Sequence, residues 1–180
     1  MTLAKSAPPS RPVKTSGAKG IPQMLAVTRA KNSPRKDPLI KAVVGIRNQS
    51  IFALVTRDLW DQTVSVRKGL PSVYIAEMSE ALAMPRANFL DSLQLPRSTI
   101  EARIKKNTPL TSSEGDAVLR AAKALAKAED VFEDRAAASA WLKREIRSLG
   151  GVTPVSLMDT DSGFALVMNT LGRIEHGVVA

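Results

Sequence analysis

The 180-residue sequence contains no cysteine and only one histidine, His176. The absence of cysteine excludes disulfide bonds, thiolate zinc sites and cysteine nucleophiles. One histidine is too few for the usual zinc ligand sets, and a serine hydrolase triad would have to use it. We therefore expect no catalytic residues, no metal and no cofactor, and we interpret the chain as a protein that is not an enzyme.

Aromatic residues are scarce as well, at 4% of the chain, although the apolar fraction of 44% is ordinary. Aliphatic side chains and alanine must then fill the core, which is typical of helical proteins. Long apolar runs are also missing, because the longest, at residues 39–46, is interrupted by Lys41 and is far too short to span a bilayer. We expect an all-α protein that is soluble and cytoplasmic and makes no membrane contact.

Acidic residues are almost absent from the first 50 positions, which hold ten lysines and arginines against Asp37 alone. Since residues 51–180 hold 16 basic and 16 acidic side chains, the whole net charge of +9 lies in this N-terminal segment. Six of the 11 prolines also lie there, and we expect residues 1–37 to form a flexible basic arm. The arm could be a solubilising tail, a nucleic-acid or partner-binding arm, or a targeting segment.

The pattern in residues 38–63 predicts a partly helical segment without clear boundaries. Ser50 can cap a helix whose apolar residues recur at helical spacing, so we expect a helix over residues 51–60. Val64 and Val66 alternate instead, which leaves a short extended piece possible before Gly69.

Residues 64–108 contain three short helical patterns separated by proline-containing connections. Met84-Pro85 ends the first expected helix, and Leu95-Pro96 separates the second from a third helix over residues 97–106. Three short helices with such tight turns are typical of a helix-turn-helix unit.

The third of these helices is the candidate DNA-binding element. It has a net charge of +3, with Glu101 as its only acid, although residues 51–180 sum to zero. Its hydroxyl and basic side chains suit phosphates and base edges. An ordinary solvated helix face is the alternative interpretation. The candidate DNA-binding residues are Arg97, Ser98, Thr99, Arg103, Lys105 and Lys106.

Residues 109–180 are expected to form a second small helical unit. Ser113 and Asp116 resemble a capping box at the start of its first helix. This helix carries an apolar stripe that includes Val118, Leu125 and Phe132, with alanines between them. The stripe could be the core of a single chain or the seam of a dimer.

Two further helices are expected after this one. Asp134 can cap a helix that we expect to run to Leu149 and to stop at Gly150-Gly151. Thr160 can cap the last helix of the chain.

The C-terminal unit combines a tryptophan, a Leu-Gly-Gly-x-Thr-Pro turn, an Asp-Thr step and a closing Arg-Ile-Glu-His-Gly segment. These motifs stand at Trp141, 149–154, 159–160 and 173–177. In this order they resemble the toxin-binding domain of Xre/MbcA/ParS-type antitoxins. Met158 stands where that family commonly has leucine, a volume-conserving difference.

Upstream residues resemble the Xre-like helix-turn-helix of the same proteins. The resemblance rests on Gly69-Leu70-Pro71 and on residues 95–100. Ala102 stands where many members have a further arginine, which weakens the indication of DNA binding.

The resemblance implies an antitoxin encoded beside a toxin that uses NAD, either a RES-domain toxin that degrades NAD or one that transfers ADP-ribose. The antitoxin would cover the NAD site of the toxin with its C-terminal domain and would form a homodimer. Its helix-turn-helix would bind promoter DNA and repress the operon. The alternative is a dimeric helix-turn-helix transcription regulator without a toxin partner. The expected toxin-binding residues are Phe164, Met168, Leu171, Arg173, Ile174, Glu175, His176 and Val178.

Overall fold

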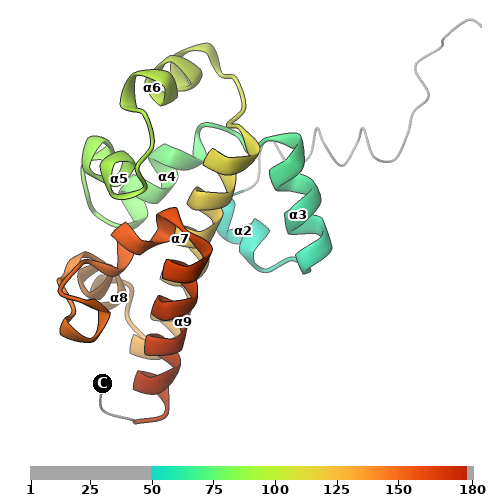
Figure 1. The fold of residues 1–180 in the computed structure, drawn as a ribbon. Helices are drawn as coiled ribbons and strands as arrows, with labels where there is room; N and C mark the ends of the chain where they lie inside the picture. Colours follow the sequence, from blue (N-terminus) through green and yellow to red (C-terminus); the bar gives the residue numbers. More distant parts are fainter. Residues whose placement is uncertain (1–49, 178–180) are drawn as a thin grey trace, which may run out of the picture. The chain divides into compact units, whose positions relative to one another are not determined.

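The computed structural model of the chain describes residues 50–177, all within one compact unit (Figure 1). These residues form no strand, apart from one isolated antiparallel bridge between Ile146 and Val152. The expected all-α class is therefore confirmed. The expected arm at residues 1–37 and the predicted toxin contact Val178 lie outside the described residues. The elements are α2 (Ile51–Val55), α3 (Leu59–Lys68), α4 (Tyr74–Ala81), α5 (Arg86–Ser92), α6 (Arg97–Lys106), α7 (Ser112–Phe132), α8 (Arg135–Lys143), η1 (Arg147–Leu149), η2 (Pro154–Asp159) and α9 (Asp161–Glu175).

Helix α7 is the central element of this unit (Figure 1). It packs against α2, α3 and α4, which precede it, and against α8, η2 and α9, which follow it. Val118 and Leu125 are fully buried, and five alanines of the same helix are buried with them. The stripe therefore lies in the core of the single chain. Phe132, at its end, is half-buried and packs on Trp141 with ring centroids 5.9 Å apart.

The three helices expected within residues 64–108 are present as α4, α5 and α6, and α6 has the expected bounds. In the turn after α5, Gln94 adopts a left-handed φ of 54°. The Leu95 amide then donates a 2.9 Å hydrogen bond to the Leu90 carbonyl, which closes the helix end as in a Schellman motif. Leu90 and Ile100 are fully buried, so α6 is anchored by its apolar side and presents its other side to solvent.

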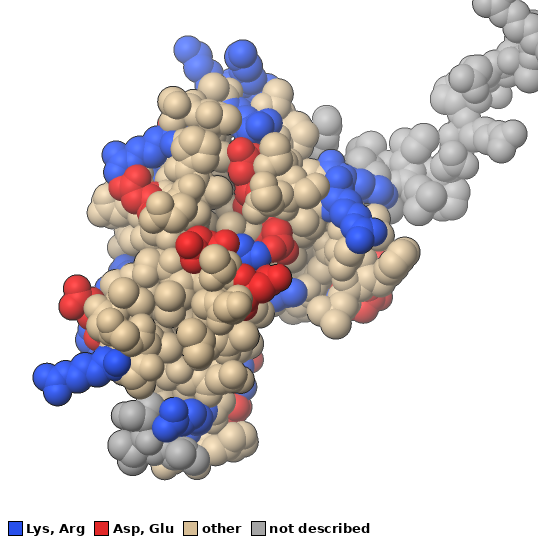
Figure 2. Space-filling view, in the orientation of Figure 1, with Lys and Arg blue, Asp and Glu red and all other residues tan. Residues whose placement is uncertain are grey.

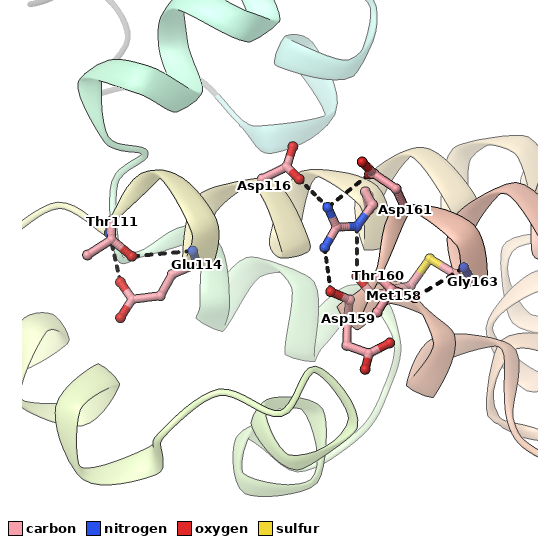
Figure 3. Close-up of polar contacts among 9 residues, drawn as sticks. Thr111, Glu114, Asp116, Met158, Asp159, Thr160, Asp161 and Gly163 are labelled. Carbon is pink, nitrogen blue, oxygen red and sulfur yellow. Dashed lines mark hydrogen bonds and ion pairs between the residues drawn. The ribbon is translucent and has the colours of Figure 1, made fainter.

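The capping box of α7 begins two residues earlier than predicted (Figure 3). Thr111, and not Ser113, is the N-cap, and its hydroxyl accepts a hydrogen bond from the Glu114 amide at 3.3 Å. The Glu114 carboxylate in turn accepts from the Thr111 amide at 2.7 Å. Glutamate at the third helical position has the length to reach back to the N-cap, whereas Asp116 pairs with Arg120 one turn further on.

The two candidate caps give a matched pair of variants. We expect Thr111→Ala to lower the free energy of unfolding by about 1 kcal/mol, because the Glu114 amide loses its acceptor. We expect Ser113→Ala to change it by less than about 0.5 kcal/mol, because this exposed serine does not cap the helix. Urea denaturation of both variants measures the difference. Equal losses in the two variants would contradict the observed cap.

The helix expected over residues 51–60 is in fact two helices, and the extended alternative for Val64 and Val66 is wrong because both residues lie in α3. The chain turns between α2 and α3, where Asp58 caps α3 by accepting from the Asp61 amide at 2.7 Å. The buried Gln62 fixes the same corner, since its amide donates to the carbonyls of residues 55 and 57 at 3.0 and 2.8 Å.

The helix capped by Asp134 is shorter than predicted, because α8 ends at Lys143 instead of continuing to Leu149. The chain becomes extended at Arg144, and the bridge between Ile146 and Val152 closes a small loop. Gly150 and Gly151 both adopt left-handed φ values, 82° and 77°, so they turn this loop and do not end a long helix.

Candidate functional site

Helix α9 begins at a tightly defined corner. The Thr160 hydroxyl caps it by accepting from the Gly163 amide at 3.1 Å, as expected from the sequence. Gly163 lies against η2 so closely that a Cβ atom added there would stand 2.2 Å from the Leu157 carbonyl oxygen. The direction in which α9 leaves η2 is therefore restricted by backbone contact.

One side of α9 belongs to the hydrophobic core. Val167 and Leu171 are 0% exposed, and Phe164 and Ile174 are half-buried against the same core. Leu171 was expected to contact a toxin, and its complete burial corrects that expectation. An apolar stripe on an amphipathic helix marks the side that the protein buries itself, which is why the prediction selected this residue.

The opposite side of α9 is exposed and partly apolar. Leu166 is 55% exposed, and it is accompanied by the exposed residues Ser162, Ala165 and Asn169. We call these four residues the outer face of α9. Figure 2 shows a broad uncharged area over this part of the molecule. The sequence-based prediction missed Leu166, although a leucine out of phase with the buried stripe was the available signal.

The predicted site residues near the end of α9 differ in their environments. Arg173 and His176 are exposed, and Met168 is half-buried. Glu175 pairs within the chain, since Lys127 Nζ donates to its Oε2 at 2.7 Å, and this hydrogen bond lowers the pKa of the Glu175 carboxyl. The pair therefore stabilises the fold at neutral pH, and its contribution is lost as the pH falls through that lowered pKa. Glu175 thus attaches the last turn of α9 to α7.

Helix α6 presents the second candidate surface, at the opposite end of the described unit from the C-terminal end of α9 (Figure 1). Ser98, Thr99, Lys105 and Lys106 are exposed there. Figure 2 shows basic side chains at this end of the molecule. Within residues 50–177 neither of the two lysines takes part in an ion pair, so their charges are available to a partner.

The two arginines of α6 are engaged within the chain. Arg97 forms an exposed ion pair with Asp91 of α5. Arg103 is half-buried, with its Nε 3.3 Å from Glu114 Oε2, and it donates to the Pro109 carbonyl at 3.2 Å. This geometry corrects the expectation that Arg103 faces DNA, because the side chain instead fastens α6 to the first turn of α7. The positive charge that α6 can offer therefore comes mainly from its lysines.

Across residues 50–177 there is no group of three or more His, Asp or Glu side chains placed to hold a metal ion. No helix in the same range has the length and apolarity needed to cross a bilayer.

Two family models match the chain. The model of the antitoxin Xre/MbcA/ParS C-terminal toxin-binding domain matches residues 127–177. The model of the antitoxin Xre-like helix-turn-helix domain matches residues 61–123. The first segment contains α8, η2 and α9, including the outer face of α9, and the second contains α4, α5, α6 and the first half of α7.

This chain matches most of the length of several curated relatives. "Antitoxin Xre" of Photorhabdus laumondii is 33% identical over 116 residues, which are 64% of this chain and 78% of the relative. "Prs ADP-ribosylating antitoxin" of Sphingobium sp. is 29% identical over 129 residues, or 67% and 81% of the two chains. "Antitoxin Xre" of Yersinia enterocolitica is 28% identical over 115 residues, or 63% and 78%.

Proposed function

The chain belongs to the Xre/MbcA/ParS family of antitoxins, and on this premise we propose that it neutralises a toxin that uses NAD by covering the NAD site. The observation that carries the proposal is the exposed, partly apolar outer face of α9, which lies in the segment matched by the toxin-binding domain. The relative from Sphingobium is named for ADP-ribosylation, a reaction for which NAD is the donor, and this name supports a toxin of the ADP-ribosyltransferase type. A RES-type toxin that degrades NAD is the other candidate.

The proposed mechanism is obstruction. Nucleotide sites are concave and largely apolar, so a rigid helix that brings Leu166 into such a site excludes the nucleotide without any acid, base or nucleophile. The exposed Arg173 lies towards the C-terminal end of the same helix and supplies a charge for the polar rim of the interface.

Co-expression with the product of the neighbouring gene tests the proposal. We expect that product to stop growth and lower cellular NAD when it is expressed alone, and this chain to restore both and to co-purify with it. An ADP-ribosyltransferase will leave a modified target protein, whereas a RES-type toxin will consume NAD without one. If the neighbour's product neither binds this chain nor affects NAD, the alternative of a transcription regulator without a toxin partner is favoured.

We also propose that the chain represses its own operon as a homodimer, with α6 on promoter DNA. The four exposed hydroxyl and lysine side chains of α6 support this role, since phosphates are the main source of protein–DNA affinity. A homodimer would place two copies of α6 on paired half-sites. Light scattering of the free protein and of its DNA complex measures the stoichiometry.

The lysines give a direct test of the DNA contact. We expect Lys105→Ala and Lys106→Ala each to weaken binding to the chain's own upstream DNA and to reduce the slope of log K against log salt by about 0.9, because each removes one phosphate contact. The exposed Arg147, which lies outside α6, is the matched control, and Arg147→Ala should leave the slope unchanged. Fluorescence anisotropy over a salt series provides the measurement.

A further inference from the structure

Arg120 of α7 is a buried arginine whose guanidinium binds groups of η2, of α9 and of its own helix. Figure 3 labels these partners, which are Asp116, Met158, Asp159 and Asp161. The residue is 9% exposed. Its Nε donates to the Met158 carbonyl at 2.8 Å and its Nη2 donates to the Asp159 carbonyl at 2.8 Å. Its Nη1 lies 3.3 Å from Asp161 Oδ1 and also pairs with the Asp116 carboxylate of its own helix.

The two carbonyls that Arg120 binds are the last two of η2, immediately before the Thr160 cap of α9. Carbonyls at a helix end lack intrahelical donors and need partners from elsewhere. A planar guanidinium can donate to two neighbouring oxygens and pair with a carboxylate at the same time, whereas the single ammonium of lysine cannot reproduce this fork. Arg120 therefore fixes the two residues of η2 that immediately precede the N-cap of α9.

The contact also joins the two matched segments. Arg120 lies in residues 61–123, which match the helix-turn-helix domain, and its acceptors lie in residues 127–177, which match the toxin-binding domain. At the other end of α9, the pair of Lys127 with Glu175 makes a second polar attachment to α7. Between these attachments lies Leu166 on the outer face.

We propose that Arg120 is the positioning residue for toxin binding. It sets the start and direction of α9, and hence the placement of the outer face, from within the core. This inference rests on the proposed function, since it assigns Arg120 a role in presenting the surface that binds the toxin. The side chain itself is too deeply buried to be a main contact with the partner.

The test compares full-length Arg120→Met and Arg120→Lys with Lys123→Met. Lys123 lies on the same helix, and its replacement removes the same charge, but it lines a hollow beside α3, and no hydrogen bond or ion pair joins it to η2 or α9 within residues 50–177. The probes are a catalytically inactive form of the neighbouring gene's product and the chain's own upstream DNA. Hydrogen exchange at residues 158–164 reports on the start of α9 without any partner.

We expect Arg120→Met to weaken binding to the inactive product by about tenfold, with faster exchange at residues 158–164 and unchanged affinity for DNA. We expect Arg120→Lys to resemble Arg120→Met, because it restores the charge but not the fork, and Lys123→Met to resemble the wild type. Full recovery in Arg120→Lys, or equal losses of toxin and DNA binding in Arg120→Met, would overturn the proposal.

Two further outcomes are decisive. If Arg120→Met does not fold, Arg120→Lys is measured against the wild type in the same way, and unchanged exchange at residues 158–164 overturns the positioning role. If the wild-type chain does not bind the neighbouring gene's product, the proposed function fails, whereas the exchange measurement still decides whether Arg120 controls the start of α9.

Discussion

Leu166→Glu is expected to abolish neutralisation while leaving the protein folded. Leu166 is 55% exposed on the outer face of α9, so its replacement should change the free energy of unfolding by less than about 0.5 kcal/mol. A carboxylate at the centre of an apolar interface would be desolvated without a partner, and we expect the dissociation constant for the toxin to rise by about 100-fold or more. Isothermal titration with an inactive toxin and a growth assay measure the two consequences.

Leu59 provides the matched control for this variant. It is 74% exposed at the start of α3, outside the segment matched by the toxin-binding domain. Leu59→Glu therefore makes the same replacement at another exposed leucine, and we expect this variant to neutralise the toxin normally. If Leu166→Glu also protects cells fully, the outer face of α9 does not bind the toxin.

Leu125→Ala is expected to have the largest effect on stability. Leu125 is fully buried in the middle of α7, where elements from both halves of the described sequence meet. Removing its side chain should lower the free energy of unfolding by about 2–5 kcal/mol, with a fall in Tm of about 2–4 °C for each kcal/mol. Because α7 supports α6 and α9 together, DNA and toxin binding should be lost over the same temperature range.

The same variant gives a thermodynamic test of the conclusion that the α7 stripe lies in the core of one chain. If Leu125 lies in the core of one chain, its replacement lowers Tm by the same amount at every protein concentration. A residue in a dimer seam would make the loss of Tm depend on concentration, since dissociation would accompany unfolding. Calorimetry over a hundredfold range of protein concentration measures the loss of Tm and shows whether it depends on concentration. Lys123→Ala is the control on the same helix.

Local signals in the sequence predict much of the fold. Helix α6 has its predicted bounds because a proline precedes it and Ile100 marks its buried side. Asp134 and Thr160 cap the helices predicted for them, since a capping side chain depends only on residues two or three positions away. The capping box of α7 was misplaced because Ser113 and Thr111 both satisfy the local pattern, and only the reach of Glu114 decides between them.

Surface assignments were harder to predict, because they depend on partners that are distant in the sequence. Arg103 is of a residue type that commonly contacts DNA, but in this chain it forms an ion pair with Glu114, eleven residues further on. Glu175 is similarly paired with Lys127, which lies on a different helix. The stripe through Leu171 correctly identified an amphipathic helix, but such a stripe shows what the chain buries and gives no direct indication of what it presents to another protein.

The 21 residues of α7 have a consequence for how proteins of this kind can diversify. The boundary between the two matched segments falls inside this helix, between residues 123 and 127. A recombination event that joined the first half of one such chain to the second half of another would therefore create its junction within a continuous helix. The hybrid would inherit Arg120 from one parent and the oxygens that it binds from the other. A hybrid made from the first half of this chain would therefore keep the contact only where its second half offers acceptors in the places of Met158, Asp159 and Asp161.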